Sequence, residues 1–258
     1  MANTYFQFKQ FTVHQEHSAM KVCTDACLFG AWVANEKNIK NAKYILDIGT
    51  GTGLLSLMLA QKLYSHSNIA QPTKMVAVEI EPGAATEAAN NFTSSPWGNH
   101  IQILNTSIQS FSVNLLNEAT NKSQLFDYII TNPPFFEGDL PSPNVNINLA
   151  SHSMALPWTQ LIESVEALLS PNGFYYVLIP ALRAYTMQKL AAQKGLQLAE
   201  EVVVYNSIKQ KPFRAIQKFI KSDESIKDIK RSNFNIKEAD NSYSKQFIEL
   251  LSPYYLHL

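Results

Sequence analysis

The stretch Tyr44-Ile45-Leu46-Asp47-Ile48-Gly49-Thr50-Gly51-Thr52-Gly53 decides the fold of this chain. Its first half is a short apolar run that is typical of a buried strand. Three glycines at alternate positions follow directly, and residues 54–63 then show the apolar spacing of an amphipathic helix. A strand that passes through a glycine turn into a helix begins an alternating strand-and-helix unit. We therefore expect an α/β fold with a mostly parallel sheet.

The same alternation continues along the chain as far as residue 220. Further strands are predicted at residues 75–80, 101–104, 126–131, 174–179, 198–205 and 213–220. Helices are predicted between them, at residues 82–92, 157–169 and 182–194. The sequence thus predicts a seven-stranded, mostly parallel sheet with an antiparallel last strand and helices on both faces. Residues 112–124 are expected to be a loop with a short helix, and residues 222–242 a loop.

The two ends of the chain lie outside this alternation. Residues 5–16 alternate aromatic or apolar with polar residues and predict a hairpin or edge strand laid over the main domain. The following helix is expected to take Thr24 or Asp25 as its N-cap and to end near Asn35. We therefore expect an N-terminal hairpin and helix cap at residues 1–35 and a main domain at residues 36–258, ending in an apolar helix or tail.

The composition excludes several classes of protein. The 21 Lys and Arg residues balance 21 Asp and Glu, which argues weakly against a nucleic-acid partner. No apolar run reaches the roughly 18 residues of a membrane span, and no signal peptide is seen. The only two cysteines, Cys23 and Cys27, predict buried thiols on one helix face, and no metal-binding motif is present. We expect a reduced cytoplasmic monomer without a metal.

The glycine loop predicts a nucleoside ligand. Its G-x-G-x-G spacing differs from the dinucleotide fingerprint, and no P-loop lysine follows. Glu79 ends the next strand, where a carboxylate holds ribose hydroxyls, and Asp47 is a further acceptor. A nucleoside without pyrophosphate that carries a positive sulfonium and an amino-acid tail fits this set, which describes S-adenosylmethionine. Ile80 is expected to pack on the adenine, although it also fits an ordinary core residue. The glycine loop as a whole also fits a turn that binds no ligand.

A second stretch, Asn132-Pro133-Pro134-Phe135, follows the predicted strand at residues 126–131. Two prolines end the strand and form a rigid corner at its carboxyl end, where ligands bind in α/β sheets. The Asn132 side-chain oxygen and the Pro133 carbonyl can accept both hydrogens of a planar amino group, while Phe135 stacks on its ring. Taken alone, these residues also fit a turn with a surface aromatic. Residues 136–151 are expected to form an active-site loop.

One stretch near the C-terminus is free of acids. Between Glu201 and Asp223 the only charged residues are five cations: Lys209, Lys211, Arg214, Lys218 and Lys221. This pattern fits a phosphate-binding patch and a solvated lysine-rich face equally well.

In their order, DIGTGTG, VEIE, Asn105-Thr106-Ser107-Ile108 and NPPF resemble the motifs of class I methyltransferases that act on planar amino groups. The flanking segments FQFKQFTVHQ, MKVCTDACLFGAW, NNFTSSPWGNHIQI and YSKQFIELLSPYYL are similar to the bacterial tRNA1(Val) adenosine-37 N6-methyltransferase family. The resemblance covers nearly the whole chain. The central motifs specify the chemistry, whereas the two ends carry the narrower match.

The resemblance implies a Rossmann-like class I fold and methyl transfer from S-adenosylmethionine to adenosine N6 in the anticodon loop of a valine tRNA. Catalytic roles are expected for Asn132, Pro133 and Phe135. Cofactor contacts are expected from Asp47, Gly49, Gly51, Gly53, Glu79, Ile80, Ser107, Ile108 and Asn132. RNA contacts are expected from Lys21, Thr24, Asp25, Pro134, Phe136, Lys211 and Arg214.

The chain departs from the family pattern at two places. The family usually has an acid where this chain has Ser107, and an Arg where residues 149–152 have none. Other functions also fit the central motifs: methylation of guanine N2 in ribosomal RNA, methylation of a protein glutamine, or catalytically silent binding of S-adenosylmethionine or RNA.

Overall fold

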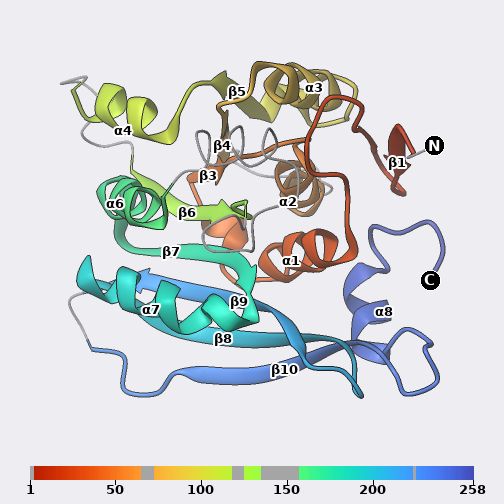
Figure 1. Ribbon diagram of the computed structural model, residues 1–258. Coiled ribbons are helices and arrows are strands. Elements are labelled where there is room, and N and C mark those ends of the chain that lie inside the picture. Colours follow the sequence, from red (N-terminus) through yellow and green to blue (C-terminus); the bar gives the residue numbers. More distant parts are fainter. Residues whose placement is uncertain (1–2, 65–72, 118–124, 135–156, 223–224) are drawn as a thin grey trace, which may run out of the picture.

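Eight strands form one sheet in the order β10-β8-β9-β7-β6-β3-β4-β5 (Figure 1). The computed structural model describes residues 3–64, 73–117, 125–134, 157–222 and 225–258. The strands of this sheet are β3 (Tyr44–Ile48), β4 (Lys74–Glu79), β5 (Ile101–Asn105), β6 (Phe126–Thr131), β7 (Leu169–Pro180), β8 (Leu196–Ser207), β9 (Pro212–Lys221) and β10 (Lys230–Lys237). Only β9 runs antiparallel, between β7 and β8. The predicted α/β fold with an antiparallel strand near its end is confirmed.

The strand order reverses at β3, which pairs with β4 on one side and with β6 on the other. Ligands of open α/β sheets bind outside the carboxyl ends of strands at such a switch point. The glycine loop follows β3, and Asn132 follows β6, so the fold brings the two motifs together at this edge.

Helices cover both faces of the sheet, as predicted (Figure 1). One apolar core contains residues of α1 (Thr24–Ala34), α2 (Leu54–Tyr64), α3 (Pro82–Thr93) and α8 (Lys245–Leu251). The other contains residues of α4 (Ile108–Asn117), α6 (Trp158–Leu168) and α7 (Ala184–Gln193). The described residues also form three short 3₁₀ helices: η1 (Ile39–Asn41), η2 (Gly98–His100) and η3 (Ala181–Arg183).

The N-terminal hairpin is confirmed, with β1 (Tyr5–Gln7) antiparallel to β2 (Thr12–His14). Phe8 and Val13 are buried in the same core as α2. Phe8 also forms a β-bridge with Tyr255, so the hairpin lies against the C-terminal segment. The division of the chain at residue 35 remains a prediction, because residues on both sides of it share one core.

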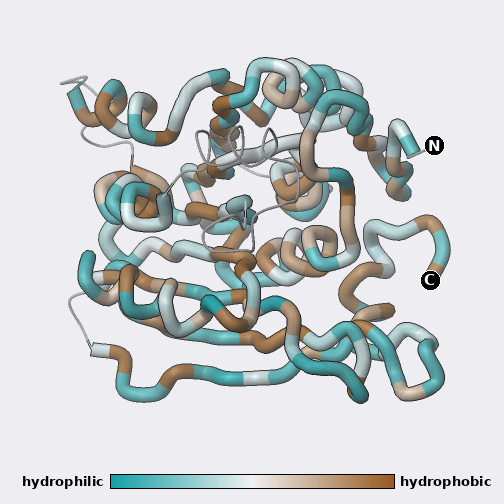
Figure 2. The backbone as a smooth tube through the Cα atoms, in the orientation of Figure 1, coloured by the Kyte–Doolittle hydropathy of each residue, from teal (hydrophilic) through white to brown (hydrophobic). Residues whose placement is uncertain are grey.

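The eighth strand corrects the prediction of a loop at residues 222–242. β10 pairs in parallel with β8 at the edge of the sheet. Only Phe234 and Ile236 are buried in it, so the strand carries too few apolar residues to stand out. Figure 2 shows it largely in teal, whereas the central strands are rich in brown. A second correction concerns α4, which begins at Ile108 rather than within residues 112–124.

The predicted N-cap of α1 is wrong. Cys23 occupies that position without a capping side-chain hydrogen bond, and the Asp25 carboxylate pairs with Arg214 instead. Both cysteines are free thiols, as predicted, but only Cys27 is buried within the helix, because Cys23 is half-buried at its N-cap. Burial raises the pKa of each to about 12. No helix in the described part of the chain combines the length and apolarity needed to cross a bilayer.

Candidate functional site

The site lies where the carboxyl ends of β3, β4 and β6 meet. The Thr131 hydroxyl, at the end of β6, donates to the Ile48 carbonyl at the end of β3, at 2.8 Å. The Gly49 N–H donates to the Val78 carbonyl of β4, also at 2.8 Å. These bonds between neighbouring strand ends fix Asn132 beside the glycine loop.

The glycines of this loop serve two different purposes. Gly49, Gly51 and Gly53 all have positive φ, at 68°, 56° and 83°. A Cβ built on Gly53 would lie 2.4 Å from the Phe92 ring, so this glycine allows the loop to pack on α3. Apart from its chain neighbours, a Cβ built on Gly49 or Gly51 would meet no heavy atom of the described residues within 4 Å. The loop therefore borders open space there, as close approach of a ligand to the backbone requires.

Glu79 is fixed by the backbone around it. One of its carboxylate oxygens accepts from the Gly51 N–H at 2.9 Å, and the other accepts from the Glu81 N–H at 3.0 Å. Each carboxylate oxygen has two lone pairs, so the group keeps capacity to accept ligand hydroxyls. Ile80 follows, and its side chain is 52% exposed. The predicted ribose acceptor and apolar surface therefore lie together at one strand end, with Glu79 buried and Ile80 exposed.

Asp47 is buried beneath the glycine loop. Its Oδ2 accepts from the Thr50 and Ser56 hydroxyls at 2.6 and 2.7 Å, whereas its Oδ1 has no hydrogen-bond partner among the described residues. Burial raises the pKa of this carboxyl to about 6, against the opposing effect of the two hydroxyls. A positively charged group bound beside Asp47 would favour its ionised form.

The segment after β5 holds two further predicted residues. The Ser107 hydroxyl accepts from the Ser110 N–H at 3.1 Å and so caps the first turn of α4. The Ile108 side chain is 4% exposed and belongs to the core.

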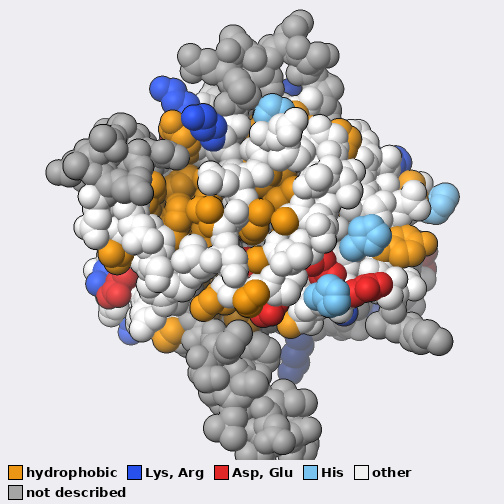
Figure 3. All heavy atoms as spheres, turned by 90° about the horizontal axis from the view of Figure 1, so that it is seen from above, with side chains coloured by type: hydrophobic (Ala, Val, Ile, Leu, Met, Phe, Trp, Pro, Cys, Tyr) orange, Lys and Arg blue, Asp and Glu red, His pale blue; other side chains and the backbone are white. Residues whose placement is uncertain are grey.

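Figure 3, which views the molecule from above Figure 1, shows hydrophobic side chains across the middle of that face, with acidic side chains beside them.

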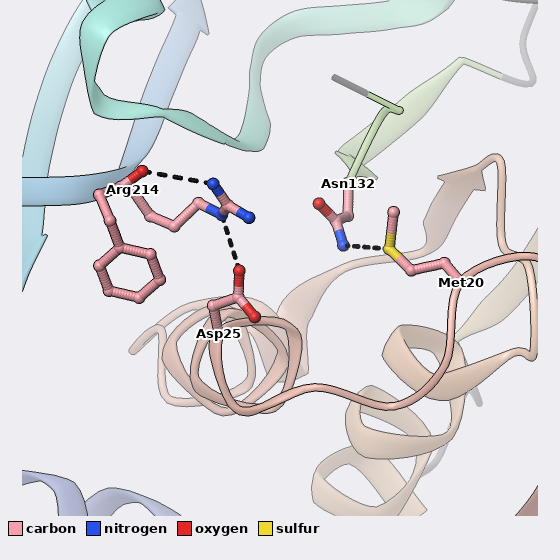
Figure 4. Close-up of polar contacts among 5 residues, drawn as sticks. Met20, Asp25, Asn132 and Arg214 are labelled. Carbon is pink, nitrogen blue, oxygen red and sulfur yellow. Dashed lines mark hydrogen bonds and ion pairs between the residues drawn. The ribbon is translucent and has the colours of Figure 1, made fainter. Parts of the chain in front are cut away.

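Among the described residues, the nitrogen of the Asn132 side-chain amide is hydrogen-bonded and its oxygen is not. Its Nδ2 donates to the Met20 sulfur at 3.5 Å, and its buried Oδ1 has no partner in the part of the chain that the structure describes (Figure 4). Pro133 is buried and Pro134 is exposed. Phe135, Phe136, the predicted active-site loop and residues 149–152 lie outside the described residues. Sequence reasoning missed Met20, because a lone methionine carries no recognisable signal.

Hydrogen bonds fix the segment at residues 15–22, which contains Met20. The Glu87 carboxylate of α3 accepts from the backbone N–H groups of His17 and Ser18, both at 2.9 Å. The Lys21 ammonium donates to the Gln15, Glu16 and Ser18 carbonyls. Lys21, which was predicted to contact RNA, thus folds back on its own segment.

The acid-free stretch meets acids from elsewhere in the chain. Arg214 pairs with Asp25 at 2.7 Å, Lys218 with Glu36 at 3.0 Å and Lys221 with Glu166 at 2.9 Å. Three of the five cations of the acid-free stretch are therefore neutralised by acids, and the five do not form a continuous basic patch. In Figure 4 the pair of Arg214 and Asp25 lies on one side of Asn132 and Met20 on the other. Lys211 is exposed between β8 and β9, and Thr24 is half-buried at the start of α1.

A cavity of about 890 Å³ lies between the ends of α1 and α2, the starts of β8 and β10, and α8, and the paired Lys218 and Glu36 are among the residues that line it. It is lined by charges of both signs, among them Lys37, Lys62 and Glu249. None of the predicted site residues lines it, so the chemistry is assigned to the strand ends.

Comparison with protein families gives a match to the model described as "Methyltransferase small domain" over residues 33–186. A protein from Cytophaga hutchinsonii named tRNA1(Val) (adenine(37)-N6)-methyltransferase is 39% identical, and the alignment covers 100% of both chains. A protein of the same name from Dyadobacter fermentans is 36% identical, over 98% of each chain.

Solved structures share the fold at low identity. A predicted O-methyltransferase from Agrobacterium tumefaciens matches with a TM-score of 0.60 and 13% identity, over 89% of this chain and 96% of its own. The 16S rRNA N2 G1207 methyltransferase of T. thermophilus, in complex with AdoMet and guanosine, matches with a TM-score of 0.52 and 19% identity, over 84% of this chain and 49% of its own.

Proposed function

Because the chain belongs to the tRNA1(Val) (adenine(37)-N6)-methyltransferase family, we propose that it methylates adenosine 37 of a valine tRNA at N6, with S-adenosylmethionine as the donor. The resemblance seen in the sequence is thereby confirmed. The observation that carries the proposal is the Asn132 amide, whose Oδ1 has no partner among the described residues and which follows β6 beside the glycine loop. A tRNA substrate also agrees with the cytoplasmic location expected from the sequence.

The residues of the site fit S-adenosylmethionine. When bound, this cofactor supplies an electrophilic methyl group on a positively charged sulfonium. Gly49 and Gly51 leave space for close approach, and Glu79 is placed to accept from ribose hydroxyls. Asp47 contributes negative charge beneath the loop, and Ile80 offers an exposed apolar surface for the adenine ring.

Asn132 and Pro133 are proposed to bind the amino group that is methylated. The Asn132 Oδ1 and the Pro133 carbonyl would each accept one N–H, which orients the nitrogen lone pair. Both oxygens carry partial negative charge, so they also stabilise the positive charge that develops on this nitrogen. Phe135 is proposed to stack on the base. A purine in a single-stranded loop fits such a site, because splaying it out breaks little pairing.

The function is tested by incubating the protein with labelled S-adenosylmethionine and unmodified valine tRNA, its anticodon stem-loop, or ribosomal RNA. We expect N6-methyladenosine in the tRNA alone. Label in N2-methylguanosine of ribosomal RNA, or on a protein glutamine, would replace the proposal with one of the other methyltransferase functions. Absence of transfer to any acceptor by a protein that binds the cofactor would indicate a silent binding protein.

Ser107→Asp is expected to tighten cofactor binding. Aspartate is also a good N-cap, so the first turn of α4 should keep its capping bond while the new carboxylate accepts from the adenine amino group more strongly than a hydroxyl. Calorimetry should show affinity for S-adenosylmethionine raised about 10-fold. Asn114→Asp, at an exposed position further along α4, is the control and should leave affinity unchanged. Equal or weaker binding by Ser107→Asp would exclude this contact.

Met20→Leu is expected to lower kcat about 3- to 10-fold, because it keeps the side-chain volume and removes the acceptor that holds the Asn132 amide. Loss of that acceptor frees the amide to turn its Nδ2 toward the substrate. Affinity for S-adenosylmethionine should stay at the wild-type value, and single-turnover kinetics measure the change. An unchanged kcat would show that the contact does not orient Asn132.

A further inference from the structure

The first turns after β7 expose large side chains along one line. Leu182 of η3 is 93% exposed and Tyr185 of α7 is 70% exposed. Lys189 follows on the same helix face, with its Nζ 5.7 Å from the centre of the Tyr185 ring. We call Leu182, Tyr185 and Lys189 the α7 stripe. Contiguous exposed apolar groups mark interaction sites, whereas single ones are ordinary surface.

Strand register places the beginning of this stripe beside the candidate site. In the parallel pair of β6 and β7, Thr131 lies opposite Val177. Pro180, three residues further along β7, therefore lies level with the chain just beyond Asn132, and it faces Arg214 of β9. η3 begins at the next residue (Figure 1). Leu182 and Tyr185 thus lie near the edge of the sheet at which Asn132 follows β6.

The charge around the stripe favours a polyanion. Residues 181–195, which form η3 and α7, and residues 202–222, which run from the middle of β8 to the end of β9, contain no Asp or Glu, whereas Glu200 and Glu201 lie earlier in β8. The same segments contain eight cations: Arg183, Lys189, Lys194, Lys209, Lys211, Arg214, Lys218 and Lys221. Four of the eight, Lys194, Arg214, Lys218 and Lys221, are paired with acids of other elements, so the exposed Lys189 and Lys211 carry the argument. An acidic partner is attracted to this rim, and a basic one is repelled.

We propose that the α7 stripe binds the anticodon-loop nucleotides that flank the methylated base. A base next to the target stacks on Tyr185 and Leu182, and the Lys189 ammonium contacts the adjoining phosphate. Aromatic stacking beside cations is how proteins hold single-stranded nucleic acid, because every base has a π-face and every nucleotide a charge. The inference rests on the proposed function and adds a contact surface to it.

The test uses the full chain and compares Tyr185→Ala and Leu182→Ala with wild type, using unmodified valine tRNA and its anticodon stem-loop. Each variant should raise the Kd and KM for both RNAs about 10-fold, since loss of one stacked base has an effect of this order. Tyr185→Phe keeps the ring and should bind like wild type. Leu116→Ala, on α4, removes a side chain that is 40% exposed at a different place and is the matched control.

Affinity for S-adenosylmethionine and the thermal midpoint should be unchanged in all four variants. Lys189→Gln should lower the slope of log affinity against log salt by roughly 0.7 to 0.9. If wild type methylates the tRNA while Tyr185→Ala and Leu182→Ala keep their Kd within twofold, the stripe does not bind RNA. A change in sedimentation with unchanged RNA affinity would assign the stripe to a second copy of the chain. If wild type modifies no RNA, the proposed function itself fails.

Discussion

Asn132→Ala is expected to lower kcat by about 100-fold or more, while affinity for S-adenosylmethionine stays near the wild-type value. The alanine removes the oxygen that accepts from the target nitrogen and the negative partial charge that faces it in the transition state. The neighbouring Pro133 carbonyl remains, so some transfer should survive. Single-turnover kinetics with labelled cofactor measure the rate, and calorimetry measures the affinity.

Asn114→Ala, at an exposed position on α4, is the control for a change of asparagine to alanine and should behave like wild type. Asn132→Asp distinguishes the role of the amide oxygen from that of the amide nitrogen, because the variant keeps an oxygen and loses the N–H that donates to Met20. A turnover of Asn132→Ala within threefold of wild type would remove Asn132 from the chemistry. Parallel losses of rate and cofactor affinity would instead give it a role in building the pocket.

Gly51→Val is expected to abolish binding of S-adenosylmethionine and leave the protein folded. The new side chain would project into the space that borders the loop, where a Cβ meets no atom of the described residues beyond its chain neighbours. Its φ of 56° is unfavourable for a branched residue and should cost about 1–2 kcal/mol of stability. Calorimetry should then detect no binding, while circular dichroism shows a cooperative thermal transition.

Gly195→Val is a matched control, because Gly195 also has positive φ, at 76°, and open surroundings, but lies at the end of α7. It should lose a similar amount of stability and bind the cofactor normally. Wild-type affinity in a folded Gly51→Val protein would contradict the placement of the ligand on this loop.

The sequence predicted those parts of the fold in which local pattern and burial agree. The strands from β3 to β9 are apolar runs bounded by turn residues, and their alternation with helices implied parallel pairing. β10 was missed because edge strands bury little, so Phe234 and Ile236 stand among polar residues. The start of α4 was missed because its first turn is polar on the outside, with only Ile108 and Phe111 directed inward.

In the site too, the residues that could be predicted are those with a local sequence pattern. Glu79 and Asn132 could be assigned to one site because each directly follows or ends a parallel strand, and such ends meet by construction. The ion pair of Arg214 with Asp25 joins residues 189 apart in the chain, and nothing local to either residue indicates the other. The contact of Met20 with Asn132 is equally remote, so tertiary structure alone reveals what orients the amide.

The pairing of the N-terminal hairpin with the other end of the chain sets an order of events during synthesis. Phe8 forms its bridge with Tyr255, and the Lys9 N–H donates to the Tyr254 carbonyl. The ribosome makes these two tyrosines long after the hairpin, so the hairpin has no partner there while the chain is growing. The hairpin that precedes the Met20 segment therefore reaches its complete set of contacts only after translation has passed Tyr255.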